Sequence, residues 1–139
     1  MGLFNFLKNI GKAHADENPS AEALTKEIKD LGLEADGVKV KVEGDKVVLE
    51  GEATQEVLEK VVLATGNSKG IAAVETNVTV TDNGKEAKFH TVEKGDNLSK
   101  IAKKYYGDAN RYPEIFEANK PMLTHPDKIY PGQVLRIPE

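Results

Sequence analysis

Cysteine is absent from this chain of 139 residues, and so is any long hydrophobic run. Without cysteine the chain has no disulfide, no thiolate metal site and no thiol nucleophile. No apolar stretch approaches the ~18 residues that a membrane-spanning helix needs. No Lys or Arg precedes the apolar N-terminus, so this segment does not match a secretory signal peptide. We therefore expect a cytoplasmic protein.

Histidine is also scarce, with only His14, His90 and His125. These three residues are far apart, and none belongs to a metal-spaced or triad-like motif. The 23 acidic residues contain no Asp-x-Asp-x-Asp-Gly calcium loop, and most are expected on a solvated surface. The sequence therefore argues against catalysis, and we expect a protein that is not an enzyme.

Net charge is modest and unevenly divided. The chain carries −4 overall, which argues against a nucleic-acid partner. Residues 1–83 hold 9 lysines and 15 acidic residues, a net charge of −6, whereas residues 84–139 hold 10 basic and 8 acidic residues, a net charge of +2. We expect the two halves to attract each other weakly and the chain to be a monomer.

The first twelve residues place apolar side chains at helical spacing, namely Leu3, Phe4, Leu7 and Ile10. Gly11 stands where a helix end favours a left-handed residue. This pattern predicts a short amphipathic helix over residues 1–12, which we expect to dock on the domain that follows. Contact with a membrane interface is the alternative, although only Lys8 and Lys12 supply positive charge there.

Residues 18–81 combine helical and strand patterns. The predicted elements are a helix from Asn18-Pro19-Ser20 to Gly32, a hairpin of strands over residues 38–42 and 47–51, a helix from Thr54 to Gly66-Asn67, and a strand within residues 71–81. This order, αββαβ, predicts a small α+β domain with its helices on one face of the sheet.

Residues 82–88 separate this domain from a second one, because residues 82–86 contain no apolar side chain and include a turn pair. Residues 89–138 then predict the order βααβ. The elements are a strand over residues 89–92, a helix capped by Asn97 and closed by Gly107, a helix capped by Asn110 with Tyr112, Ile115 and Phe116 inward, and a strand over residues 134–137. Such a small domain has a core that supplies only a few kcal/mol.

Specific residues in both domains resemble known families. The C-terminal domain resembles a LysM domain through His90-Thr91-Val92, Lys94-Gly95-Asp96-Asn97-Leu98, Ile101-Ala102 and Pro131-Gly132-Gln133-Val134-Leu135. Residues 18–81 resemble a BON domain through the αββαβ order and the turns at Gly51-Glu52 and Gly70-Ile71. Together with the opening Met1-Gly2-Leu3-Phe4-Asn5-Phe6, the chain resembles the bacterial BON-LysM potassium-binding proteins. This resemblance implies a K⁺ sensor whose two domains close together when the ion binds.

Potassium requires several neutral oxygens, which backbone carbonyls can supply without any particular side chain. Unpaired carbonyls concentrate in the last turn of a helix, where the helix dipole is also negative. Two such ends are predicted, one over residues 7–11 and one in the loop of residues 66–71. Combined with the resemblance to the potassium-binding proteins, these two helix ends imply a K⁺ site made of main-chain carbonyls from Leu7, Ile10, Gly66, Ser68 and Ile71. Two ordinary glycine-terminated helices are the structural alternative.

Two other functions remain open. LysM domains generally bind chains of N-acetylglucosamine, as in peptidoglycan, and the corresponding residues here are Gly95, Asp96, Asn97, Leu98, Ile129, Tyr130 and Gly132. BON domains also associate with phospholipid surfaces, for which Phe4 and Phe6 are the natural contacts, although the net charge of −6 in this half argues against anionic membranes. For the tyrosines of the C-terminal domain, packing in the core is expected over stacking on sugar rings.

Overall fold

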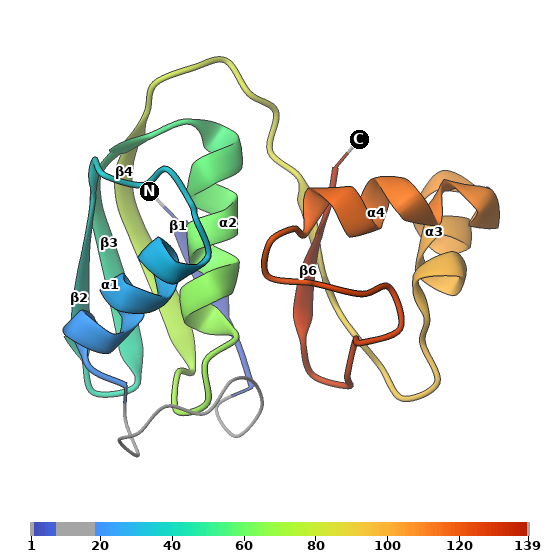
Figure 1. Ribbon diagram of the computed structural model, residues 1–139, viewed down its shortest axis with the longest axis horizontal. Helices are drawn as coiled ribbons and strands as arrows, with labels where there is room; N and C mark the ends of the chain where they lie inside the picture. Colours follow the sequence, from blue (N-terminus) through green and yellow to red (C-terminus); the bar gives the residue numbers. More distant parts are fainter. Residues whose placement is uncertain (1, 8–18, 139) are drawn as a thin grey trace.

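The structure is a computed structural model that describes residues 2–7 and 19–138. Two α+β domains lie side by side, joined by a segment that passes from β4 to β5 (Figure 1). The N-terminal domain contains β1 (Gly2–Asn5), α1 (Ala21–Asp30), β2 (Val38–Glu43), β3 (Lys46–Ala53), α2 (Gln55–Gly66) and β4 (Ala73–Val80). The C-terminal domain contains β5 (Lys88–Thr91), α3 (Leu98–Tyr106), the 3-10 turn η1 (Ala109–Arg111), α4 (Tyr112–Ala118) and β6 (Val134–Ile137). The predicted α+β class and the orders αββαβ and βααβ are confirmed.

The N-terminal domain is a four-stranded sheet in the order β1-β4-β3-β2, with α1 and α2 on one face (Figure 1). β2 and β3 form an antiparallel hairpin, and β3 pairs with β4 in parallel. Side-chain caps start both helices: Ser20 accepts a hydrogen bond from the Ala23 N–H at 3.1 Å, and Thr54 accepts one from the Val57 N–H at 3.2 Å. The core between helices and sheet includes Leu24, Leu49, Val61, Val62, Leu63 and Val74, each at most 1% exposed.

The helix predicted for residues 1–12 is wrong over Gly2–Asn5, which form the edge strand β1. β1 pairs antiparallel with β4, with Leu3 opposite Glu75 and Asn5 opposite Ala73. This pairing supplies backbone partners along a whole strand, whereas an isolated helix of about ten residues is marginal in water. As a result, successive side chains of this segment point to opposite faces of the sheet: Leu3 is 60% exposed, while Phe6 is buried. Residues 8–12 lie outside the described part of the chain.

The C-terminal domain places α3 and α4 beside the two-stranded sheet of β5 and β6. The Asn97 side chain caps α3 through the Lys100 N–H at 2.8 Å, and Gly107 ends the helix with φ +76°. Asn110 does not cap the next helix as predicted: Asp108 caps η1, and α4 begins at Tyr112 without a side-chain cap. Tyr112 is 38% exposed and so does not point inward, whereas Ile115 is fully buried.

The two domains share a continuous apolar interface. Val134 of β6 belongs to the core of the N-terminal domain, and Phe89 and Met122 pack against that core. Phe4 of β1 stacks on Phe89 of β5 with ring centroids 4.9 Å apart. Because apolar area from both domains is removed from water here, this contact stabilises one arrangement of the pair.

Candidate functional site

The loop from α2 to β4 is compact and tied by its own backbone. The Asn67 N–H donates to the Leu63 carbonyl at 3.0 Å, and the Ile71 N–H donates to the Ser68 carbonyl at 3.2 Å. Gly70 has φ +102°, a backbone conformation that residues with a Cβ rarely adopt. The loop therefore reverses the chain within a few residues and presents several carbonyls at the C-terminal end of α2.

The N-terminal segment packs directly on this loop. The Phe6 N–H donates to the Ala72 carbonyl at 2.9 Å, and the Phe6 ring is only 8% exposed. A Cβ built on Gly66 would overlap the Phe6 ring, so glycine leaves the space that the ring occupies. Leu7 follows Phe6 directly and therefore comes to the same loop through the end of β1, although its side chain is 54% exposed.

The predicted ligand residues fall into three groups. Gly66, Ser68 and Ile71 lie together in the α2–β4 loop, and all three are buried. Leu7 is the chain neighbour of Phe6, whose N–H donates to the Ala72 carbonyl next to this loop. Ile10 lies outside the described residues.

The loop offers the oxygen chemistry that a large monovalent cation requires. In the part of the chain that the structure describes, the Gly66 and Ile71 carbonyls accept no hydrogen bond, and the Ser68 carbonyl accepts one from Ile71. The negative end of the α2 dipole points into the same loop. Within residues 2–7 and 19–138, no three His, Asp or Glu side chains gather as a metal site. The oxygens that this loop offers to a cation are therefore neutral main-chain carbonyls, which fit K⁺ better than a divalent ion.

Asn67, which sequence reasoning did not select, connects this loop to the other domain. Its side-chain Nδ2 donates to the Val134 carbonyl at 2.8 Å, and its Oδ1 accepts from the Val134 N–H at 2.9 Å. Both bonds reach the backbone of β6, 67 residues away in the chain. We call this pair of bonds the Asn67 clasp.

A buried ion pair joins the same two elements further along α2. The Glu59 carboxylate oxygen Oε1 accepts from Arg136 Nη2 at 2.8 Å and from its Nε at 3.0 Å, and the two side chains are only 4% and 8% exposed. The other oxygen, Oε2, accepts from the Ala87 N–H at 2.8 Å and from Gln55 Nε2 at 2.9 Å. Both carboxylate oxygens are therefore hydrogen-bonded, and two of the bonds come from the guanidinium. The sequence signals only one partner of the pair, because Glu59 is a charged residue at helical spacing from the apolar Val62 and Leu63.

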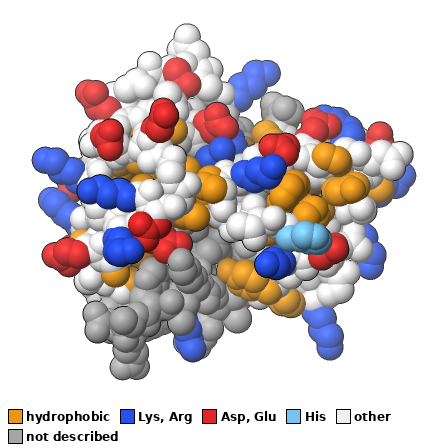
Figure 2. Space-filling view, in the orientation of Figure 1, with side chains coloured by type: hydrophobic (Ala, Val, Ile, Leu, Met, Phe, Trp, Pro, Cys, Tyr) orange, Lys and Arg blue, Asp and Glu red, His pale blue; other side chains and the backbone are white. Residues whose placement is uncertain are grey.

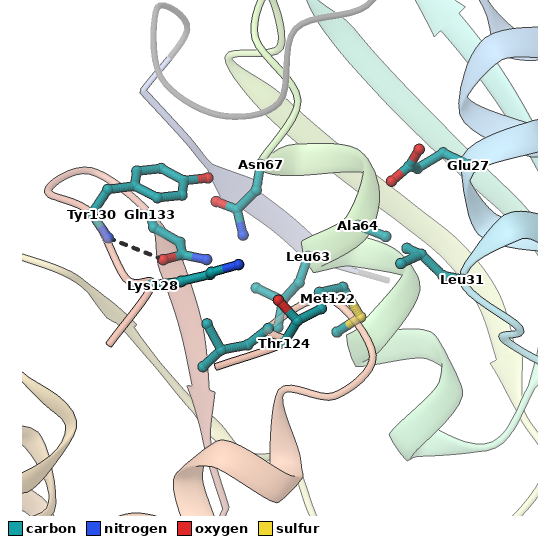
Figure 3. Close-up of a pocket in the computed structure, with 11 residues that line it drawn as sticks. Glu27, Leu31, Leu63, Ala64, Asn67, Met122, Thr124, Lys128, Tyr130 and Gln133 are labelled. Atoms are coloured by element: carbon teal, nitrogen blue, oxygen red, sulfur yellow. Dashed lines mark hydrogen bonds between the residues drawn. The ribbon is translucent and has the colours of Figure 1, made fainter. Parts of the chain in front are cut away.

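A cavity of about 320 Å³ lies between the domains, next to the Asn67 clasp. One wall comes from α1 and α2, including Leu31, Leu63 and Ala64, and the other comes from the segment that leads into β6. Figure 3 shows Lys128 and Tyr130 on the second wall, where the Tyr130 N–H donates to Gln133 Oε1 at 3.3 Å. Burial raises the pKa of the Tyr130 hydroxyl. Tyr130 therefore faces the domain junction.

Most of the residues predicted for glycan binding have structural partners within the C-terminal domain. Asp96 Oδ2 accepts from the Glu93 N–H at 2.9 Å and lies 3.0 Å from His90 Nε2. Asn97 caps α3, Leu98 is 2% exposed, Ile129 packs on the core, and Gly95 and Gly132 hold turns with positive φ. A cavity of about 480 Å³ does include Asn97 and Leu98, but its other wall is Tyr112 and His125–Asp127. Ile129, Tyr130 and Gly132 do not line it.

His90 is buried in the C-terminal domain and bridges two polar groups. Its Nδ1 lies 2.9 Å from the Tyr105 hydroxyl, and its Nε2 meets the Asp96 carboxylate. The Glu93 N–H, and after it His90, hold the pKa of the Asp96 carboxyl below its ordinary value. This chain of hydrogen bonds ties β5 to the start and the end of α3.

The charge and apolar character of the described residues bear on contact with a membrane. On the face shown in Figure 2, acidic and basic side chains are intermingled, and hydrophobic side chains gather on the half that contains α3 and α4. Among the described residues, no helix has the length and apolar character to cross a bilayer. Phe4 is stacked on Phe89 and Phe6 is buried, so neither ring is presented as a lipid contact.

Two family models match the chain in succession. The BON domain model matches residues 16–82, and the LysM domain model matches residues 90–138. The fold and this order define a two-domain BON-LysM protein.

Over its whole length the chain is similar to the potassium binding protein Kbp of Escherichia coli O6:H1. The two are 44% identical over 148 aligned positions, which cover 100% of this chain and 99% of Kbp. The chain therefore belongs to the Kbp family. It also shares 53% identity over 49 residues with an uncharacterized protein of Deinococcus radiodurans, covering 35% of this chain and 19% of that protein. A match to the uncharacterized protein YqbP of Bacillus subtilis is 38% identical over 61 residues, covering 37% of this chain and 28% of YqbP.

Proposed function

We propose that this chain binds potassium ions and acts as a cytoplasmic K⁺ sensor, not as an enzyme. The observation that carries the proposal is the full-length similarity to a potassium binding protein, with 44% identity and no large uncovered segment. The architecture supports it, because the α2–β4 loop collects main-chain carbonyls where the N-terminal segment meets the C-terminal end of α2.

The ion is held by the carbonyls of Leu7, Ile10, Gly66, Ser68 and Ile71. Such oxygens replace the loosely held hydration shell of K⁺ without adding a negative charge. The smaller ions Na⁺ and Li⁺ hold their water more strongly. A ring of carbonyls spaced for K⁺ therefore compensates less well for the loss of their hydration shells. Selectivity then follows from the spacing of the carbonyls.

Binding stabilises the closed arrangement of the two domains. A ligand that binds only one state stabilises it by RT ln(1 + [L]/Kd), which is about 2.7 kcal/mol at a hundredfold excess over Kd. This is comparable with the few kcal/mol that so small a C-terminal domain supplies on its own. The sensor therefore works as a monomer whose domain docking reports the K⁺ concentration.

Thermal unfolding at constant ionic strength tests the proposal. We expect KCl to raise the melting temperature of the full chain in a saturable way, and NaCl and LiCl to raise it far less. Isothermal titration with KCl should give a single site. Equal shifts for the three salts, or no heat of binding with K⁺, would contradict the function.

Glycan binding is the second candidate, favoured by the cavity of about 480 Å³ beside the exposed Tyr112 ring. A partly exposed tyrosine at a cavity can stack on a sugar ring. Retention on insoluble peptidoglycan that resists salt and is lost in Tyr112→Ala would establish this function. Association with phospholipid is less well supported, because Phe4 and Phe6 pack within the protein.

A further inference from the structure

The free edge of β6 is covered by two asparagine side chains. On its other edge β6 pairs with β5, where the Val92 N–H donates to the Gln133 carbonyl at 2.8 Å. Backbone groups alternate between the two edges of a strand, so those of Val134 and Arg136 face away from β5. Asn67 binds the N–H and C=O of Val134, and Asn119 binds the N–H and C=O of Arg136 at 2.8 and 3.0 Å.

The two asparagines make the same bonds from different places. Asn119 follows α4 of the C-terminal domain and also donates to the Ile115 carbonyl at 2.7 Å, so its interaction stays within one domain. Asn67 comes from the N-terminal domain and projects from the end of α2 into the space between the domains (Figure 3). The orientation of both amides is fixed, because a backbone N–H only donates and a carbonyl only accepts.

Asn67 also stands between two of the carbonyls assigned to the ion, those of Gly66 and Ser68. Its backbone N–H is held by the Leu63 carbonyl, so its side chain leaves α2 in a direction set by the conformation of the loop. Any ligand that fixes the carbonyls on both sides of Asn67 therefore also fixes the position from which the amide reaches β6.

We infer that Asn67 is the positioning residue that couples ion binding to domain docking: K⁺ on the loop carbonyls holds the Asn67 clasp on β6, and the clasp in turn holds the carbonyls in place for K⁺. This inference rests on the proposed function. Asn67 supplies no atom to the proposed carbonyl set, so its effect on affinity acts through the clasp. Coupling between two such events is reciprocal, and loss of the clasp must weaken ion binding.

Two variants of the full chain test this coupling against each other. Asn67→Ala removes the clasp but deletes none of the proposed ligand oxygens. Asn119→Ala removes the matching pair of bonds from the same strand but lies away from the loop. We expect Asn67→Ala to lower K⁺ affinity, measured by titration calorimetry at constant ionic strength, at least about fivefold, the lower end of typical couplings. Asn119→Ala should lower stability and leave K⁺ affinity unchanged.

A spectroscopic readout separates positioning from general destabilisation. In ¹H–¹⁵N spectra the Val134 amide of the wild type should shift on addition of KCl, and this shift should be absent in Asn67→Ala. If circular dichroism shows that Asn67→Ala is unfolded, Asn67→Leu replaces it in both measurements. Leucine has nearly the size of asparagine and adds no charge beside the ion, but it can neither accept from the Val134 N–H nor donate to the Val134 carbonyl.

Each outcome has one meaning. Unchanged K⁺ affinity in a folded Asn67 variant, or equal losses in the Asn67 and Asn119 variants, overturns the coupling and leaves potassium binding intact. A wild-type chain that binds no K⁺ overturns both the coupling and the proposed function.

Discussion

Gly66 has no side chain because the Phe6 ring fills the place where a Cβ would stand. Gly66→Ala must therefore displace the ring or the end of α2, a form of overpacking that costs about 1–3 kcal/mol. We expect this loss of stability together with weaker K⁺ binding, measured by denaturation and calorimetry. Gly44→Ala is the matched control, since no heavy atom lies within 4 Å of its added Cβ and only its φ of +65° is strained. Equal K⁺ affinity in wild type and Gly66→Ala would show that the packing of Phe6 on Gly66 does not support K⁺ binding.

Asp96 makes the C-terminal domain sensitive to acid. The Glu93 N–H and His90 lower the pKa of its carboxyl in the folded state. A lowered pKa contributes stability that is complete above the unfolded value of about 3.9 and is lost as pH falls below it toward the folded value. Asp96→Asn should be less stable at pH 7 and should lose less stability as the pH falls below about 4. Parallel curves of Tm against pH for the two proteins would contradict this assignment.

At the scale of elements, β1 connects the domains through its side chains. Phe4 lies on the edge strand of one sheet and stacks on Phe89 of the other sheet. A double-mutant cycle with Phe4→Ala and Phe89→Ala should give a coupling energy of about 0.5–1.5 kcal/mol in urea denaturation, as aromatic pairs do beyond their buried area. Additive losses would mean that the two rings stabilise their own domains separately.

Most helices and strands were predictable because their signals are local. Caps and glycines predicted α1, α2 and α3, and alternation predicted the β2–β3 hairpin. β1 was missed because Leu3, Phe4 and Leu7 satisfy a helical spacing, and the decisive partner, β4, is distant in the chain, with Gly2 opposite Thr76. For α4, the Asn110 cap signal competed with Asp108, whose side chain accepts from the Asn110 N–H at 2.9 Å.

The candidate site was predictable only in part. The pair of glycines at Gly66 and Gly70 indicated the loop, and the structure brings Gly66, Ser68 and Ile71 together there. The clasp was not predictable, because Asn67 resembles an ordinary residue at a helix end and its partner is a backbone position in another domain. Contacts of this kind depend on how two finished domains meet, which no local pattern encodes.

At the scale of the whole molecule, Glu59 and Arg136 hold the domains together. Removing one partner of a buried ion pair leaves the other charge uncompensated, which costs about 3–5 kcal/mol. We expect that loss for Glu59→Gln in urea denaturation. The control Glu50→Gln breaks the surface pair with Lys41, whose side chain is 63% exposed, and should cost far less. Equal stability of Glu59→Gln and wild type would show that the apolar interface alone holds the domains.

Under the proposed function, this arrangement accounts for the effect of a small ion on the whole chain. The carbonyl loop, Asn67 and Glu59 all belong to α2 or its end, and both side chains reach β6. In the proposed mechanism, order in the loop is transmitted along α2 to β6 of the other domain. The proposed sensor needs no carboxylate cluster, because ion binding is proposed to order main-chain carbonyls.

Anomalous diffraction from crystals soaked in RbCl tests the central claim most directly, because Rb⁺ resembles K⁺ in size and charge and scatters strongly. We expect one strong peak at the α2–β4 loop, surrounded by the carbonyl oxygens of Leu7, Ile10, Gly66, Ser68 and Ile71. A loop without a peak, a peak bound by carboxylates elsewhere, or a lysine ammonium in this position would contradict it.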